Sequence, residues 1–201
     1  MKIVLKIVSV FLTITLLYGI APAEGLGPFA IGTRFVYLSP VANFDGRLGN
    51  LGNNFEDDFK PDLFVQFYPT ESLSIEYSLM ISEHGLSFGF PTHIIGSTSL
   101  FTQTVSGKLH LSPDSTFSPY LGVGINILMP FNTSCFSDRF SIDNHTGWIT
   151  QTGFDFRTTK NTWFNFEYRF MEMGTQAQIN GTSYQYDLSP HVFAFGIKYR
   201  F

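Results

Sequence analysis

The sequence predicts an all-β fold, an eight-stranded antiparallel transmembrane up-and-down barrel of the bacterial outer membrane. Three observations lead to this prediction: a targeting segment at the N-terminus, repeated alternation of bulky apolar with small or polar residues, and a regular exchange of short turns with long loops. The composition agrees, because 44% of the residues are hydrophobic and 17% are aromatic, whereas only 14% are charged. A soluble domain of this size is not expected to carry so many aromatic residues.

The first 23 residues have the pattern of a secretory signal peptide. Lys2 and Lys6 precede an apolar run over residues 8–17, and Ala21-Pro22-Ala23 gives the small-x-small pattern of a cleavage site. The apolar run is shorter than the roughly 20 residues that a spanning helix needs. We therefore predict a signal peptide over residues 1–23, cleaved after Ala23, and a barrel over residues 24–201. The one cysteine, Cys135, rules out an internal disulfide.

The last ten residues show the alternation most clearly. Bulky groups stand at Phe193, Phe195, Ile197, Tyr199 and Phe201, with small or cationic residues between them. Because a strand has a period of two, one face meets an apolar medium and the other a polar interior. The final aromatic residue, Phe201, is predicted to be the signal that the barrel assembly machinery recognises.

The same alternation recurs in segments of the length that a tilted strand needs to cross a bilayer. The predicted strands cover residues 29–42, 59–68, 73–83, 100–111, 117–129, 148–157, 162–171 and 192–201. Short polar turns are predicted at residues 69–72, 113–116 and 158–161, and long loops at 43–58, 84–99, 131–145 and 174–188. Short turns on the periplasmic side and long loops outside are typical of outer-membrane barrels.

A soluble eight-stranded barrel of the lipocalin type is the alternative fold. It would place the bulky apolar face inside and the small residues outside. An eight-stranded barrel is only just wide enough for side chains to fill, so the large residues belong on the exterior. We therefore prefer the membrane barrel, with outer-membrane lipid around it.

The inward residues divide into two sets by their predicted height in the barrel. An apolar upper lumen is predicted on the outer half, formed by Val36, Leu38, Met80, Leu100, Leu128, Ile149, Met171 and Val192. A charged lower plug of mixed sign is predicted on the periplasmic half, formed by Arg34, Glu76, Lys108, Asp155, Arg157, Glu167, Lys198 and Arg200. Opposed charges in a narrow lumen are expected to pair, because an isolated buried ion is far less stable than a paired one. Lys60 and Asp62 are predicted as polar exceptions near the outer rim.

Four segments resemble the OmpW family of small outer-membrane proteins. They are residues 27–34, the Pro-Tyr-x-Gly-x-Gly-x-Asn run within 117–126, residues 151–155 and the ending at 196–201. The resemblance implies a narrow apolar interior that passes small hydrophobic molecules, with exit through the barrel wall into the membrane as one route. Pro40, Pro61 and Pro130 are the residues predicted to interrupt strand pairing at such an exit, because proline lacks a backbone donor.

The predicted function is therefore an outer-membrane channel for uptake of small hydrophobic molecules in a Gram-negative bacterium. The alternative is a structural or adhesion barrel whose long loops bind a partner, as phage and bacteriocin receptors do. We expect no enzyme activity, because His110 and Ser112 lie beside a periplasmic turn, away from surface lipid. No metal or other cofactor is expected, because the histidines lack ligand spacing. A net charge of −4 without basic clusters gives no support for a nucleic-acid partner.

Overall fold

The computed structural model describes residues 26–39, 42–44, 58–88, 93–135, 140–142, 144–179, 182–188 and 191–201. The predicted signal peptide at residues 1–23, Pro40 and most of the predicted loop at residues 43–58 lie outside the described residues. In the part of the chain that is described, no helix has the length and apolar character to span a membrane.

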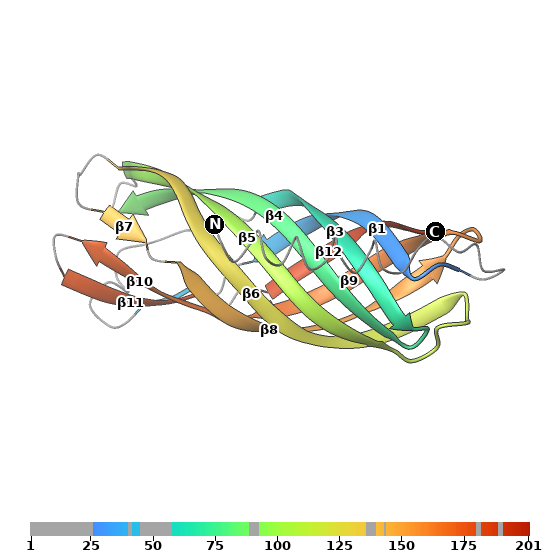
Figure 1. Ribbon diagram of the computed structural model, residues 1–201. Helices are drawn as coiled ribbons and strands as arrows, with labels where there is room; N and C mark the ends of the chain where they lie inside the picture. The colour runs from blue at the N-terminus through green and yellow to red at the C-terminus, as the bar shows by residue number, and fades with distance from the viewer. Residues whose placement is uncertain are drawn as a thin grey trace.

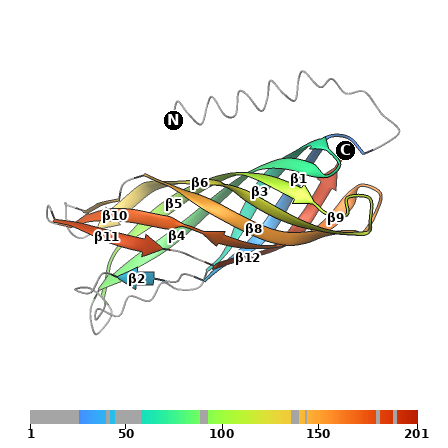
Figure 2. The ribbon, with the colours of Figure 1, turned by 90° about the horizontal axis from the view of Figure 1, so that it is seen from below.

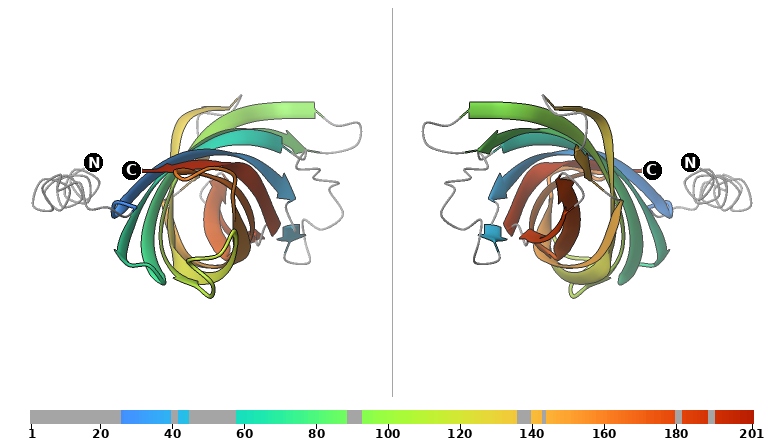
Figure 3. Two further views of the ribbon diagram at one scale, coloured as in Figure 1. Left: turned by 90° about the vertical axis from the view of Figure 1, so that its right-hand side faces the viewer. Right: turned by 90° about the vertical axis from the view of Figure 1, so that its left-hand side faces the viewer.

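Eight long strands form a closed antiparallel barrel in the order β1-β12-β9-β8-β6-β5-β4-β3 (Figure 1). These strands are β1 (Phe29–Ser39), β3 (Asp58–Thr70), β4 (Leu73–Phe88), β5 (His93–His110), β6 (Phe117–Cys135), β8 (His145–Arg157), β9 (Thr162–Met171) and β12 (His191–Arg200). The first and last of them close the barrel, with register pairs from Ala30↔Arg200 to Ser39↔His191. The two views of Figure 3 look along the barrel from its opposite ends. The predicted fold class is thus confirmed.

The two ends of the barrel differ. At one end, which we call the turn end, short turns join β3 to β4, β5 to β6 and β8 to β9, and the C-terminus lies beside them (Figures 1 and 2). At the other, the loop end, four shorter strands form a second sheet in the order β2-β11-β10-β7. Their bounds are Ala42–Phe44 for β2, Phe140–Ile142 for β7, Met173–Ile179 for β10 and Thr182–Leu188 for β11.

The exterior of the barrel wall is apolar. Large side chains on the predicted outward faces are strongly exposed, including Phe35 at 56%, Leu63 at 61% and Val123 at 66%. Their inward neighbours on the same strands, such as Arg34 and Phe64, are buried. So many exposed aromatic and aliphatic groups in one band are stable only against acyl chains, so the exterior is a membrane-facing surface.

The strands extend further at the loop end than the sequence predicts, and all four predicted loops are wrong in part. The predicted loop at 43–58 contains the end of β2, and the predicted loop at 131–145 contains the end of β6 and all of β7. The predicted loop at 84–99 is largely strand, because β4 continues to Phe88 and β5 begins at His93, with a register shift between Leu86 and Ser87. The predicted loop at 174–188 contains the β10–β11 hairpin. Apolar alternation marks only the part of a strand in contact with lipid, whereas backbone pairing continues beyond it.

Candidate functional site

The lumen near the loop end is filled by a layer of apolar side chains. Val36, Leu38, Met80, Leu128, Ile149, Met171, Val192 and Ala194 form one buried group, which we call the apolar cluster. Leu100 is partly buried and packs against it. All eight residues predicted for the upper lumen therefore lie in or against this layer, and Ala194 is a further member. The exposed fractions of its members are 0–7%, so the layer excludes water from this level of the barrel.

Six charged side chains lie directly beside this layer, on its turn-end side. We call Arg34, Asp62, Glu76, Lys108, Glu167 and Arg169 the ion network; each has an exposed fraction of at most 3%. Arg34 is its centre: Nη2 lies 2.8 Å from Asp62 Oδ2 and 2.8 Å from Glu76 Oε1, and Nη1 lies 3.2 Å from Glu167 Oε1. One guanidinium thus joins carboxylates from three other strands.

Two further cations complete the ion network. Lys108 Nζ donates to Glu76 Oε2 and Glu167 Oε2, each at 2.6 Å. Arg169 donates from Nη2 to Asp62 Oδ2 at 3.1 Å and from Nε to Glu167 Oε1. The three cations and three carboxylates cancel, so the network is neutral as a whole. Paired in this way, the charges avoid the large desolvation penalty of isolated buried ions and cross-link the barrel interior.

A second polar layer lies nearer the turn end. Lys198 Nζ lies 2.5 Å from Asp155 Oδ2 and 2.7 Å from the hydroxyl of Tyr68. Asn165 Nδ2 donates to Asp155 Oδ1 at 2.8 Å and to the Tyr120 hydroxyl at 2.9 Å. The Tyr120 hydroxyl in turn donates to Glu167 at 2.7 Å, so this layer is continuous with the ion network. Together the two layers leave a densely bonded polar interior beneath the apolar cluster.

Two residues of the predicted charged plug lie at the turn end itself. Arg200 makes a bidentate contact with the exposed Glu71, at 2.8 and 2.9 Å. Arg157 is half-buried, with its guanidinium 5.3 Å from the ring centre of Trp163. Both therefore contact turn residues or a rim aromatic and make none of the recorded contacts of the ion network.

Two members of the ion network were placed wrongly or missed from the sequence. Asp62 is predicted near the outer rim, but it lies in the ion network, because β3 pairs with β1 in a register that sets Asp62 opposite Arg34. Arg169 is absent from the predicted set. The alternation along β9 does predict that Arg169 faces inward, because Glu167 and Met171 both face inward and Arg169 lies midway between them on the same face.

The pairing of β3 with β4 stops short of the loop end. The last register pair is Asp62↔Met80, next to Pro61. Beyond it, β3 continues along β1 as far as Leu38↔Asp58, while β4 continues along β5 as far as Phe88↔His93. We call this place the β3–β4 seam. It lies against the apolar cluster, because Met80 belongs both to that cluster and to the last pair of the ladder.

The two other candidate prolines differ from Pro61. Pro130 lies within the β5–β6 ladder, where it pairs with Leu100. On its other side, the β6–β8 ladder ends two residues before Pro130, at Leu128↔His145. Pro40 lies outside the described residues.

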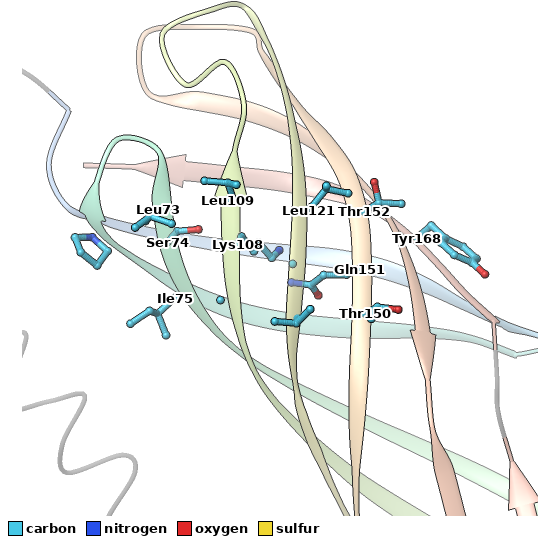
Figure 4. A pocket seen from close by; sticks show the side chains of 14 residues that line it. Leu73, Ser74, Ile75, Lys108, Leu109, Leu121, Thr150, Gln151, Thr152 and Tyr168 are labelled. Atoms are coloured by element: carbon cyan, nitrogen blue, oxygen red, sulfur yellow. The ribbon is translucent and has the colours of Figure 1, made fainter.

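A groove of about 710 Å³ lies elsewhere, on the membrane-facing surface (Figure 4). Its walls carry Leu73, Leu109, Leu121 and Tyr168, from β4, β5, β6 and β9. These residues belong to the outward faces of their strands. A Cβ at Gly107, in the groove floor, would meet no atom within 4 Å. The groove is therefore open to the exterior, although its lining also includes the inward-facing residues Ser74, Lys108 and Gln151.

Among the described histidines, His110 lies in the polar interior, where its Nδ1 is 3.8 Å from Asp155 Oδ2. His110 Nε2 lies 2.9 Å from Ser74 Oγ, inside the lumen near the turn end and away from the lipid surface. Across the described residues, no three histidine, cysteine, aspartate or glutamate side chains are grouped as metal ligands.

A closed eight-stranded barrel with an apolar exterior, short turns at one end and a filled lumen defines a small outer-membrane protein. The family model of the OmpW family matches residues 40–201, and the chain belongs to that family. Accordingly, it is an outer-membrane protein of a Gram-negative bacterium, and its turn end faces the periplasm. The OmpW family is of transport or structural type and is not an enzyme family.

The relatives agree with this assignment. The chain is 28% identical to an outer-membrane protein of Sinorhizobium fredii, over 89% of this chain and 82% of the relative. It is 27% identical to outer membrane protein W of Escherichia coli, over 93% of this chain and 94% of the relative.

Solved structures share the fold at lower sequence identity. The crystal structure of OprG from Pseudomonas aeruginosa gives a TM-score of 0.72 at 16% identity, over 88% of this chain and 97% of the other. AlkL in lipid bilayers gives 0.70 at 14% identity, over 90% and 93%. These likenesses show the architecture of the barrel.

Proposed function

We propose that the protein takes up small hydrophobic molecules across the outer leaflet and releases them sideways into the membrane through the β3–β4 seam. One observation carries the proposal: Met80 lies in the apolar cluster and also forms the last pair of the β3–β4 ladder. An apolar solute that reaches the cluster is therefore beside a place where the barrel wall is no longer joined by that ladder.

The polar interior supports a sideways rather than a straight path. Beneath the apolar cluster, the ion network joins β1, β3, β4, β5 and β9 through buried ion pairs. An apolar solute gains nothing by displacing these contacts, because each separated ion would be left desolvated and unpaired. Its path of lowest free energy leads from one apolar environment into another, which is the acyl phase of the membrane.

The proline at the seam supports the same route. Pro61 precedes Asp62 on β3 and has no backbone N–H, so it cannot donate to a ladder with β4. Its register partner on the other side is Phe35 of β1. The wall between β1 and β3 therefore continues past Pro61, and the separation of strands is directed toward β4.

Uptake by intact cells tests the proposed function. Gram-negative cells that express the protein should take up radiolabelled octane faster than cells that carry an empty vector. Leu38→Asp and Leu128→Asp each place a charge within the apolar cluster and should reduce the initial rate to that of the vector control. Leu111→Asp is the matched control, because Leu111 is exposed in the β5–β6 turn. A shift on unheated gels establishes that each variant is assembled.

Two outcomes separate the alternatives. If octane uptake is the same with and without the protein, the hydrophobic-uptake proposal fails, and the result favours a structural or adhesion function. If Leu38→Asp assembles and transports octane at the wild-type rate, the path does not pass through the apolar cluster.

The proposal extends to biogenesis. We propose that residues 1–23 are removed on export, and that the barrel assembly machinery then inserts residues 24–201 among outer-membrane lipids. N-terminal sequencing of the protein purified from outer membranes tests the first step, with Glu24 expected as the first residue.

A further inference from the structure

One polar side chain in the lumen lacks hydrogen-bond partners at both of its polar atoms. Asn126 has an exposed fraction of 0%, and neither its Nδ2 nor its Oδ1 is bonded to any other protein group. Its side chain faces inward, on the same face of β6 as Leu128. A buried amide in this state is unusual, because an unmade hydrogen bond in an apolar site is unfavourable.

The position of this amide is defined by its neighbours. The register partners of Asn126 are Thr104 on β5 and Gly147 on β8. Leu128 lies two residues further along the inward face of β6, and Ile149 lies two residues beyond Gly147; both belong to the apolar cluster. The amide therefore lies at the level of the apolar cluster, with Leu128 toward the loop end and Ile149 toward the turn end.

The backbone leaves room for the amide. A Cβ placed on Gly147 would lie 2.8 Å from Asn126 Oδ1 and only 1.8 Å from the carbonyl oxygen of Glu172. A larger residue at position 147 would therefore fill the space that the Asn126 side chain uses. The close approach of the Glu172 carbonyl alone requires glycine here, and the Asn126 amide occupies the space beside it without a bond to any protein group.

A second amide lies nearby, and one of its polar atoms has no hydrogen-bond partner. Gln151 Nε2 donates to Ser106 Oγ at 2.8 Å, whereas its Oε1 has no partner. Gln151 pairs in register with Gly122 on β6 and Arg169 on β9, so it lies at the level of the ion network. The apolar cluster and the adjoining level of the ion network thus contain the Asn126 amide and Gln151 Oε1, which no protein group uses.

We propose that Asn126 binds the polar end of the transported solute, and that this solute is a neutral amphiphile with one hydrogen-bonding group. An alcohol, ketone or amide could place its polar group against Asn126 and its hydrocarbon part among the apolar cluster. This inference rests on the proposed function and names the substrate class.

The polar end of the solute is expected to be neutral because of the charges already present in the lumen. The three cations and three carboxylates of the ion network pair with one another, and among the carboxylate oxygens only Asp62 Oδ1 has no hydrogen-bond partner. A carboxylate or ammonium group beside Asn126 would therefore be desolvated without a counter-ion. A hydroxyl or carbonyl needs only the hydrogen bonds that Asn126 provides.

The uptake experiment uses three solutes of equal chain length: octane, 1-octanol and octanoate. Cells that express the wild-type protein should take up 1-octanol faster than octane, and octanoate no faster than vector cells. Asn126→Leu keeps the approximate size of the side chain and removes its hydrogen bonds. It should lower the protein-dependent uptake of 1-octanol by about fivefold, which is the value of one neutral hydrogen bond, and leave octane uptake unchanged.

Ser118→Ala is the matched control. Ser118 Oγ is also buried without a partner, but Ser118 pairs in register with Asp155, in the polar layer near the turn end. Its substitution should change uptake of neither solute. Equal loss of octane and 1-octanol in Asn126→Leu, or loss of neither, overturns the inference.

A direct binding measurement keeps the inference testable if Asn126→Leu fails to assemble or if the wild-type protein transports neither solute. The side-chain amide resonances of Asn126 are followed by NMR in wild-type protein in nanodiscs. Titration with 1-octanol should shift them, whereas octane and octanoate should not. Unchanged resonances overturn the inference and leave a bound water as the partner expected for this amide. Shifted resonances without uptake uphold the site and refute the transport proposal.

Discussion

Arg34 and Asp62 lie opposite each other in register on β1 and β3, and their side chains meet inside the barrel with Arg34 Nη2 2.8 Å from Asp62 Oδ2. Both side chains are fully buried. The pair therefore joins two strands of the wall and also anchors the ion network, whose three cations and three carboxylates balance.

Arg34→Met should strongly destabilise the barrel. The variant leaves two cations against three carboxylates in a desolvated site, and breaking a buried ion pair from one side lowers stability by about 3–5 kcal/mol. Urea unfolding of the protein in lipid vesicles measures the change in the free energy of unfolding.

The double variant Arg34→Met/Asp62→Asn is the control for this prediction. It restores the balance, with two cations and two carboxylates, and should recover part of the lost stability. A double variant no more stable than Arg34→Met would show that Arg34 acts through packing, for example on the Phe64 ring 4.1 Å from its guanidinium carbon, rather than through charge balance.

The ion network should also limit ion flow. Wild-type protein in planar bilayers should show very small conductance, because the apolar cluster and the ion network fill successive levels of the lumen. The double variant Arg34→Ser/Glu167→Ser removes one charge of each sign and much side-chain volume, and should conduct more. Arg200→Ser loses contacts with Glu71, the Gly27 carbonyl and the Tyr68 ring but none within the ion network, and it should conduct as the wild type does. Equal conductance in all three proteins would contradict this role of the network.

The alternation of side chains predicts the wall of the barrel well, because a strand in lipid has one simple requirement on each face. The outward positions of Phe164 and Phe195, exposed at 55% and 51%, follow from parity alone. Parity also identifies inward residues such as Glu76 and Met171. Parity does not give the position of a residue along the barrel axis. That position depends on the tilt and stagger of the strands, which determine which inward residues lie at the same level.

Asp62 shows the consequence of this missing information. Its inward direction is evident from the sequence, but its contact with Arg34 depends on the β1–β3 register. Outward polar residues are a second case: Gln103 belongs to the membrane-facing side of β5, yet it is only 2% exposed. Tyr77 on the adjacent strand donates to its Oε1 at 2.7 Å, a cross-strand contact that depends on the register of β4 and β5.

Phe201 should be required for efficient assembly, although it contributes little to the folded core. Its side chain is 58% exposed and its backbone N–H donates to the carbonyl of Phe29 at 3.1 Å, a bond that any residue can make. Phe201→Ser should therefore lower the amount of barrel in outer membranes, as judged by the unheated-gel shift. Protein refolded in vitro should unfold at nearly the same urea concentration as the wild type. A large loss of stability in vitro would assign Phe201 a structural role instead.

A disulfide across the β3–β4 seam should block release of solute into the membrane. Pro61 and Ile81 each lie one residue beyond the last pair, Asp62↔Met80, toward the loop end. In a Cys135→Ser background, the variant Pro61→Cys/Ile81→Cys should form a disulfide once the strands approach, because such a bond needs Cα atoms within about 4.4–6.8 Å of each other. The oxidised protein should take up octane slowly, and reduction should restore the rate.

Leu63→Cys/Leu79→Cys is the matched control, because these residues are already register partners within the ladder. Its disulfide should leave uptake unchanged. If the seam disulfide forms fully and octane still enters at the wild-type rate, solute leaves the lumen by another path.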